Sequence, residues 1–382
     1  MQASTIGTPT AGHCGTIFVA IELSQKTWLI TLHSPDQDRF SRHKLEGGDH
    51  GGLLALIEKV RVRVRERLGS TPRVVSCYEA GYDGFWLHRL LAAAGITNFV
   101  FDAASIAVEQ RARRTKTDRI DGELLLRTLM AHLRGEPRVV RIVRVPSVEV
   151  EDARRASRER DRLVKEQTAH TNRIKGLLRL LGMAVGNPRR RDWLAWLARQ
   201  RDWQGQPLPP HLLAEAKREH ARLMLVRDQL MALEEAQAAQ TLPVPAPVAK
   251  QRDLLLRLKA LGPAFTATLV NELFHKGFRN RREVASYCGL TPSPWKSGGI
   301  DREQGISKAG NRRARHKAIE LAWLWLRHQG DSALSRWFRA RTANAGKRAK
   351  RIAIVALARK LIVALWRYLT SGLIPEQATM KA

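Results

Sequence analysis

The sequence predicts a mixed α/β amino-terminal domain followed by a mostly helical remainder. Two observations support this prediction. Short β-branched, apolar segments alternate with segments of helical spacing between residues 15 and 133, and long helical patterns with basic flanks dominate from Glu151 onward. A chain of 382 residues is long enough for two or three domains, and its 44% hydrophobic content is ordinary for globular proteins.

The amino-terminal part begins with three short strands, predicted over residues 15–22, 27–33 and 39–45 from apolar runs separated by turn residues. A helix follows at 50–68, then a strand at 73–78 that ends at Glu79, a helix at 85–94, a strand at 98–101 and a helix from Asp118 to about Leu133. This element order is that of the ribonuclease-H-like fold, so we expect a mixed sheet covered by helices.

Four carboxylates stand where such a fold would gather them. Glu22 ends the first strand, Glu79 ends the fourth, and Asp118 and Asp121 open the last helix three residues apart, on one helical face. The carboxyl ends of neighbouring strands meet in the crevice where open α/β sheets bind ligands, and carboxylate oxygens suit Mg²⁺ or Mn²⁺. Asp118 and Asp121 alone would also fit an ordinary helix start. The convergence of four acids favours a metal site.

The charge of the chain indicates a polyanionic partner. Its 66 Lys and Arg against 36 Asp and Glu give a formal net charge of +30, and nucleic acid is the leading candidate. Residues 336–351 carry seven cations and no acid, which predicts a phosphate-binding surface. The three cysteines lie far apart in the sequence, so neither a zinc site nor a disulfide framework is expected. No signal or membrane-spanning pattern occurs, and a cytoplasmic, nucleoid-associated protein is expected.

The middle of the chain changes in composition. Residues 154–179 hold nine Lys or Arg against three acids around a narrow apolar seam, which predicts a long basic helix. After a break at 182–210, a second long helix at about 212–239 would pair with the first as an antiparallel hairpin or in a dimer. The proline-rich segment that begins at Thr241 predicts a stiff linker and a domain boundary.

Beyond the linker, residues 258–269 have the pattern of a helix-hairpin-helix element, whose glycine turn lets backbone amides approach a phosphate. This motif usually has a glycine where the chain has Ala260, so a purely structural turn is an equal alternative. Residues 287–315 are expected to form a loop rich in Pro, Gly and Ser that leads into a basic helix and contains Ser293, Ser297 and Ser307.

Three sets of residues together resemble a known family. They are Tyr-Glu-Ala-Gly at 78–81, Lys-Thr-Asp-Arg-Ile-Asp at 116–121, and the Gly-Leu-Thr-Pro, Ser-Gly-Gly and Gly-Ile-Ser-Lys-Ala-Gly-Asn blocks within 289–311. From Ile17 to about Tyr368 the chain resembles the DEDD-type transposases of the one-ten insertion-sequence family, the bridge-RNA-guided serine recombinases. The resemblance implies that Glu22, Glu79, Asp118 and Asp121 form the acidic tetrad, with Glu22 where the family usually has Asp. It also implies that Ser297 is the nucleophile, with Ser293 and Ser307 as weaker candidates.

The resemblance also implies partners and domains. Donor and target DNA, a structured guide RNA and a homo-oligomer, dimer or tetramer, are expected, with a catalytic site shared between subunits. The implied division is a disordered tail at 1–14, a ribonuclease-H-like domain at 15–148, a helical oligomerisation region at 149–240, a linker at 241–250, a helical transposase domain at 251–370 and a tail at 371–382. The cations expected to contact nucleic acid are Lys296, Arg302, Lys308, Arg312, Arg313, Arg315, Lys347 and Arg348.

The leading hypothesis is therefore recombination, in which a serine hydroxyl attacks a DNA phosphodiester and a 3′ hydroxyl later reverses the linkage. Two alternatives remain open. One is a structure-selective nuclease of the Holliday-junction type that uses the tetrad and a metal-activated water. The other is a nucleic-acid-binding protein without catalysis, in the case that Glu22 disables the site.

Overall fold

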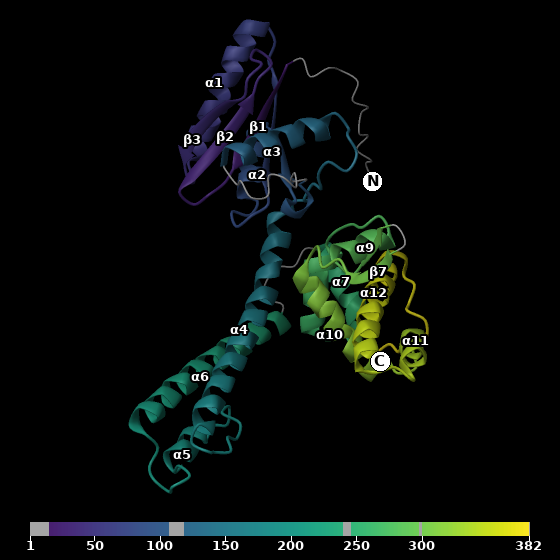
Figure 1. Cartoon of the computed structure of the whole chain (residues 1–382). Helices are drawn as coiled ribbons and strands as arrows, with labels where there is room; N and C mark the ends of the chain where they lie inside the picture. Colours follow the sequence, from purple (N-terminus) through teal and green to yellow (C-terminus); the bar gives the residue numbers. More distant parts are fainter. Residues whose placement is uncertain (1–14, 107–117, 240–245, 298–299, 382) are drawn as a thin grey trace. The chain divides into compact units, whose positions relative to one another are not determined.

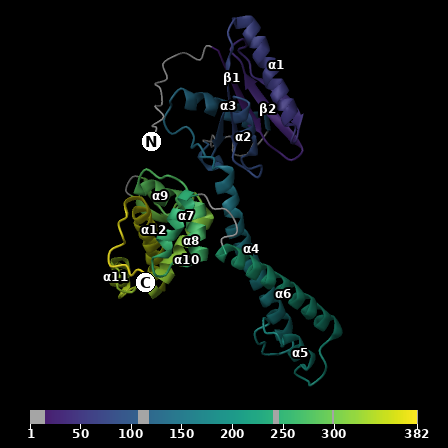
Figure 2. The same ribbon diagram turned by 180° about the vertical axis from the view of Figure 1, so that it is seen from behind.

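The computed structural model describes the backbone of residues 15–106, 118–239, 246–297 and 300–381, and for residues 104, 118–120, 296, 297 and 300–303 it describes the backbone alone. The predicted tail at 1–14 and the first half of the predicted linker lie outside these ranges. The chain divides into two compact units, Met1–Val145 and Pro146–Ala382. Each unit is shown from two sides in Figures 1 and 2.

The first unit is built on a five-stranded sheet (Figure 1). Its strands are β1 (Thr16–Glu22), β2 (Thr27–His33), β3 (Ser41–Glu46), β4 (Arg73–Glu79) and β5 (Thr97–Phe101), in the order β3-β2-β1-β4-β5. β1, β2 and β3 are antiparallel neighbours, whereas β4 is parallel to β1 and β5 is parallel to β4. The predicted mixed α/β amino-terminal domain is confirmed.

Helices cover both faces of this sheet because its central strands carry apolar side chains in both directions. Ile17, Val19 and Ile21 of β1 pack with α1 (His50–Leu68) and α2 (Trp86–Ala93). Phe18 and Ala20 pack on the opposite face with α3 (Asp118–Leu133), through its Leu125, Leu126 and Leu129. A 3₁₀ turn, η1 (Ala103–Ser105), follows β5. Even-numbered residues of β1 therefore face α3.

The second unit begins with two long helices, α4 (Val148–Arg179) and α6 (Pro210–Ala238), which run side by side in Figures 1 and 2. Arg160 pairs with Glu234 at 2.7 Å and His170 with Glu219 at 2.7 Å, so the helices are antiparallel. Of the two arrangements expected, the hairpin within one chain is observed. A short helix that the sequence did not predict, α5 (Trp193–Ala198), packs Trp193 and Leu197 into the same cluster as Ile174.

The rest of the second unit is a helical core. Its elements are α7 (Ala246–Leu256), α8 (Pro263–Leu269), a π-helical turn η3 (Val270–Phe274), α9 (Arg281–Tyr287), a hairpin of β6 (Pro292–Ser297) and β7 (Ile300–Ile306), α10 (Arg312–His328), α11 (Ala333–Thr342) and α12 (Lys347–Ser371). Leu357, Leu361 and Leu365 of α12 are fully buried in its centre. The predicted helical character of this part is confirmed. No helix in the ranges described above is long and apolar enough to span a membrane.

Three local expectations differ from the structure. The predicted loop at 287–315 contains the β6–β7 hairpin, because prolines are tolerated in a two-stranded ribbon that has no central strand. The predicted linker at 241–250 overlaps α7, whose first turn accommodates Pro247. The predicted tail at 371–382 is bound to the core: the amide of Lys259 donates to the carbonyl of Thr379, and the amide of Lys381 donates to the carbonyl of Arg257.

Candidate functional site

Glu22 and Glu79 end adjacent parallel strands of the first unit. The register pairs Ile21 of β1 with Tyr78 of β4, so the next residues, Glu22 and Glu79, lie opposite each other where both strands end. We call this carboxyl-terminal edge of the sheet the acidic edge. Neighbouring strands are about 4.8 Å apart. Alternation along the strands gives Glu22 the face of Ala20 and Glu79 the face of Cys77, and both of those residues face α3. The two carboxylates therefore share one edge and one face.

The first turns of α3 lie over this edge because Gly122 allows a close approach to the sheet. A β-carbon at Gly122 would stand 2.4 Å from the Thr31 hydroxyl and 3.9 Å from Leu29 Cδ2. Leu29 is the antiparallel partner of Glu22. The helix start that carries Asp118 and half-buried Asp121 is thus held against the strand that neighbours Glu22. The side chain of Asp118 is outside the described part.

A third acid of the same helix start has a structural partner. Glu123 forms an ion pair with Arg42 of β3, and this contact ties α3 to the antiparallel side of the sheet. The hydroxyl of Tyr78 donates to the carbonyl of Gly84 at 3.1 Å and so fixes the loop that follows Glu79. These two contacts hold the elements from which the candidate ligands project.

The donor chemistry of this edge fits a hard divalent cation, since carboxylate oxygens are the ligands that Mg²⁺ prefers. Among the side chains that the structure describes, no three of the His, Cys, Asp and Glu type are grouped closely enough to hold a metal ion. Glu22, Glu79 and Asp121 are among these side chains, so the structure does not group the three as a metal site. Glu22 and Glu79 share one edge, Asp121 lies in the helix turn that Gly122 holds against β2, and Asp118, one turn before Asp121, is the remaining predicted ligand.

In the second unit, Ser297 is the last residue of β6 and pairs with Ile300 of β7. It therefore stands at the tip of the hairpin, directly before Gly298 and Gly299. Its side chain and those of Lys296 and Arg302 are outside the described part. Ser293 lies within β6, and Ser307 follows β7. The hydroxyl of Thr291 donates to Ser307 Oγ at 3.3 Å, and the amide of Ser307 donates to the carbonyl of Thr291 at 2.8 Å.

The base of this hairpin is fixed by two glycines at close backbone approaches. Gly289 has φ +62° and Gly310 has φ +116°, a region that disfavours other residues. A β-carbon on Gly289 would meet the carbonyl oxygen of Ala309 at 2.4 Å, and one on Gly310 would meet that of Tyr287 at 2.3 Å. The two glycine-containing blocks that flank the hairpin are therefore packed directly on each other.

A buried polar network joins this base to α4. Glu272 of η3 is 2% exposed and accepts hydrogen bonds from Arg158 Nε at 2.7 Å and from Asn311 Nδ2 at 3.2 Å. Burial opposes ionisation of Glu272, but the Arg158 hydrogen bond and charge, with Asn311 and Arg313, outweigh it and lower the pKa of the carboxyl. Burial and the nearby Arg154 lower the pKa of His275 to about 3, so its ring is neutral at pH 7. The sequence carries no signal for this network, because Glu272 looks like any acid within a helical pattern.

Six of the eight cations predicted to contact nucleic acid have described side chains, and they fall into two groups. Arg313 pairs with Asp161 at 2.7 Å, and Arg315 Nη1 donates to the carbonyls of Lys308 at 2.8 Å and Cys288 at 3.2 Å. These two guanidinium groups stabilise contacts within the second unit. In contrast, Lys308 and Arg348 line a cavity along α12, while Arg312 and Lys347 are exposed.

The turn predicted as part of a helix-hairpin-helix element has a left-handed residue where that motif usually has glycine. Ala260 adopts φ +84°, the left-handed region for which glycine is usual. Gly262 then serves as the N-cap of α8, with φ −96°. The alanine therefore keeps the turn at a cost in strain.

Comparisons with known proteins agree with these features. Residues 22–183 match the DEDD transposase family profile, and residues 252–337 match the profile "Transposase IS116/IS110/IS902 family". The chain is 47% identical over 376 residues to y4rJ of Sinorhizobium fredii, which carries the name of a transposase, covering 96% of this chain and 95% of that one. It is 29% identical to the transposase for insertion sequence element IS1111A of Coxiella burnetii, over 60% of this chain and 62% of the relative. It is 24% identical to the transposase for IS1328 of Yersinia enterocolitica, over 90% and 98%.

Both profiles and all three relatives are those of transposases. The chain belongs to the IS116/IS110/IS902 family of insertion-sequence transposases. The predicted family resemblance is confirmed.

Proposed function

We propose that this transposase cuts and rejoins DNA strands through a phosphoserine-linked intermediate, with four carboxylates as metal ligands and Ser297 as nucleophile. The observation that supports it most is the position of Glu22 and Glu79 on one edge and one face of the sheet, under the start of α3. The strand order β3-β2-β1-β4-β5, with β1, β4 and β5 parallel, supports a ribonuclease-H-like assignment for the first unit.

Glu22, Glu79, Asp118 and Asp121 would hold Mg²⁺ or Mn²⁺. When bound, the ion supplies charge that neutralises the non-bridging phosphate oxygens and orients the attack. Glu22 is one methylene longer than aspartate, and its place at the end of β1 gives that side chain a fixed starting point. Asp118 and Asp121 would bind from one face of the first turn of α3.

Ser297 performs the covalent step in this proposal. Its Oγ attacks the DNA phosphorus, the bond from phosphorus to the 3′ oxygen breaks, and the serine proton passes to a base or to solvent. The leaving strand ends in a free 3′ hydroxyl, and the other strand stays attached to serine through its phosphate. The 3′ hydroxyl of a new partner then attacks the same phosphorus and releases the serine. The place of Ser297 at the tip of the β6–β7 hairpin, next to two glycines in the sequence, supports this role, because a hydroxyl must align with the phosphate for in-line attack.

Donor and target DNA are the substrates in this proposal, and a structured RNA is the guide. Exchange of strands between two DNA molecules needs more than one active site, so the working form is a dimer or a tetramer. The net charge of +30 supports association with these polyanions.

The test is a covalent adduct. Incubation with cognate DNA, guide RNA and Mg²⁺ is expected to give a denaturation-resistant protein–DNA species whose attachment maps to the peptide that contains Ser297. Ser297→Ala abolishes the adduct, whereas Ser293→Ala and Ser307→Ala are matched controls that retain it. An adduct lost only in Ser307→Ala would move the nucleophile to Ser307. Cleavage without an adduct in any variant would favour the metal-water nuclease.

A further inference from the structure

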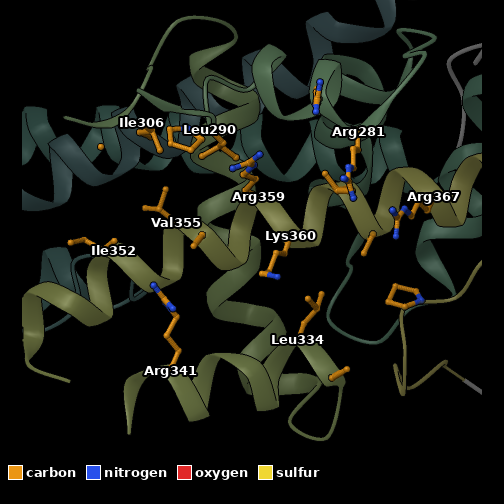
Figure 3. Close-up of a pocket in the computed structure, with 18 of the residues that line it drawn as sticks. Arg281, Leu290, Ile306, Leu334, Arg341, Ile352, Val355, Arg359, Lys360 and Arg367 are labelled. Atoms are coloured by element: carbon orange, nitrogen blue, oxygen red, sulfur yellow. The ribbon is translucent and has the colours of Figure 1, made fainter. Parts of the chain in front are cut away.

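A cavity of 1330 Å³ runs along α12 in the second unit. Figure 3 shows α12 crossing it, with Arg281 at the start of α9 on one side and Arg341 of α11 on the other. This volume exceeds the roughly 300–1,000 Å³ of a typical small-molecule site. A segment of a polymer therefore suits it better than a single small ligand.

We name this cavity the α12 groove. Its lining is strongly cationic. Its nine cations are Arg281, Arg282, Lys308, Arg341, Arg348, Arg351, Arg359, Lys360 and Arg367, and Glu376 is its single acid. Within the described part of the chain, none of these nine side chains is in an ion pair with a carboxylate, whereas Arg160 and Arg173 of α4 pair with acids of α6. An unneutralised row of this kind is complementary to a chain of phosphates.

Two of these cations are held in position by an aromatic ring. Lys360 Nζ lies 4.8 Å from the centroid of Trp337, and Arg341 Cζ lies 6.0 Å from it. Cation–π attraction at these distances restricts both side chains before any ligand arrives. The backbone at Lys308 is also held, since its carbonyl accepts from Arg315 at 2.8 Å. Part of the groove is thus preorganised, which lowers the entropy cost of binding.

The groove also exposes apolar side chains between its cations. Ile352 is 62% exposed, Leu373 64% and Ile374 51%, and Val355 and Leu334 are half-buried beside them. A duplex presents phosphates on its outside and hides its base faces. A single strand presents phosphates together with apolar base faces, the combination that a basic groove with an apolar floor accepts.

We infer that the α12 groove binds a segment of single-stranded DNA, with phosphates on the cations and bases over Ile352 and its neighbours. The choice of DNA as the nucleic acid rests on the proposed function, in which strands are opened and exchanged. The spacing Arg348, Ile352, Val355, Arg359, Val363 and Arg367 places these side chains on one face of α12, so the strand runs along the helix.

The test measures equilibrium binding of a labelled single-stranded oligonucleotide by the full chain, without metal, in a Ser297→Ala background that permits no chemistry. Arg359→Gln with Lys360→Gln is expected to weaken binding roughly 25-fold at 0.1 M salt and to reduce the slope of log affinity against log salt by about 1.4. Lys217→Gln with Arg218→Gln removes the same charge from exposed positions of α6 and leaves both quantities nearly unchanged. Equal losses of affinity in the two double variants would contradict the proposed binding site.

The apolar floor has its own test. Ile352→Ser, an exposed change that does not disturb the core, is expected to weaken single-strand binding several-fold and leave duplex binding of the same sequence unaltered. Equal effects on both forms would overturn the single-strand assignment. An RNA oligonucleotide bound more tightly than DNA and weakened by the groove variants would overturn the choice of DNA. Absence of a covalent adduct, with these binding results intact, counts against the proposed chemistry and not against the groove.

Discussion

Asn311 and Glu272 join the start of α10 to the π-helical turn: Asn311 Nδ2 donates to Glu272 Oε2 at 3.2 Å, while Asn311 Oδ1 accepts from the backbone amides of Arg313 and Ala314. One side chain therefore caps a helix and binds a buried carboxylate. The same Glu272 accepts from Arg158 of α4, so three separate elements meet at this pair. The glycine-containing block that ends at Asn311 therefore connects α10, η3 and α4 next to the β6–β7 hairpin.

Glu272→Gln is expected to destabilise the second unit by about 2 kcal/mol at pH 7, because it removes the charge that compensates Arg158 and Arg313. The expected loss is no larger because Arg158 is 54% exposed and can regain water. Urea unfolding followed by tryptophan fluorescence measures the change. Glu234→Gln, which removes the exposed partner of Arg160, is the matched control and costs less than about 0.5 kcal/mol.

The pH dependence of that difference is a second readout. The folded-state pKa of Glu272 is lowered, so its stabilisation is fully present above the ordinary glutamate value of 4.5 and is lost as the pH falls through the folded-state value. The stability gap between wild type and Glu272→Gln should therefore narrow from pH 7 to pH 3.5. A gap that widens on acidification would show that the carboxylate is not stabilised by its arginine partners.

Gly122→Ala tests how closely α3 approaches the sheet. Alanine normally favours a helix over glycine by about 1 kcal/mol, but here its β-carbon would stand 2.4 Å from the hydroxyl of Thr31, which is fully buried. Overpacking costs about 1–3 kcal/mol, so a net loss of stability is expected. In the double variant with Thr31→Ala, the contact disappears and most of the loss is recovered. Additive losses in this double-mutant cycle would contradict the close approach.

The elements of the first unit were predictable from residue patterns because each has a strong local signal. The β-branched runs end at turn residues, and His50–Leu68 and Asp118–Leu133 carry clear helical spacing, so their predicted bounds coincide with the structure. Short or proline-containing elements lack such a signal. The helix α5 has only six residues, and Pro292 and Pro294 make the sequence of β6 typical of a loop. Contacts with residues distant in the sequence decide whether α5 and β6 form.

Ala260→Gly is expected to stabilise the second unit by about 1 kcal/mol, since glycine adopts φ +84° without the steric penalty of a β-carbon. Gly262→Ala is a useful comparison two residues away, where φ is −96°. Apart from its chain neighbours, no atom of the described residues lies within 4 Å of the place that a β-carbon would take at Gly262, so that change should cost only the roughly 0.5–1 kcal/mol by which alanine is a poorer N-cap than glycine. Thermal unfolding of both variants measures the contrast. A destabilising Ala260→Gly would show that the alanine methyl contributes packing that exceeds the strain.

The acidic edge is tested by conservative changes of its carboxylates. Asp121→Asn and Asp118→Asn are expected to abolish recombination while affinity for nucleic acid changes little, because each variant removes the charge of one proposed metal ligand from a chain with 66 Lys and Arg. Glu22→Asp should retain activity, since a carboxylate remains at the end of β1. Strand-transfer assays are paired with measurements of Mn²⁺ binding, which should fall, and of nucleic-acid affinity, which is retained only if the variant is folded. Full activity in both aspartate variants would remove these residues from the site.

The candidate site was only partly accessible to sequence analysis. Glu22 and Glu79 could be found because each ends an apolar strand and the predicted topology brings the ends of these strands together; the parallel register of β1 and β4 places them side by side. The contacts of Arg313 and Arg315 within the protein could not be found, because a cation in a half-buried ion pair or bonded to a carbonyl looks like any surface cation in a basic sequence. The regular spacing from Arg348 to Arg367 is a signal for the α12 groove, but Arg281 and Arg341 reach it only through tertiary packing.

Because α4 is one continuous helix, its length fixes the angle about the helix axis between two sets of side chains that bind different partners. Its residues Arg158 and Asp161 bind Glu272 and Arg313 of the helical core, whereas Leu163 and Ile174 pack in the seam with α6. One residue inserted between these two sets would turn one relative to the other by about 100° and separate either the ion pairs or the apolar seam from its partner. An insertion of seven residues would restore the phase to within about 20°. Relatives that differ in length here should therefore differ by about 7, 11 or 18 residues, the lengths that keep the two sets in phase.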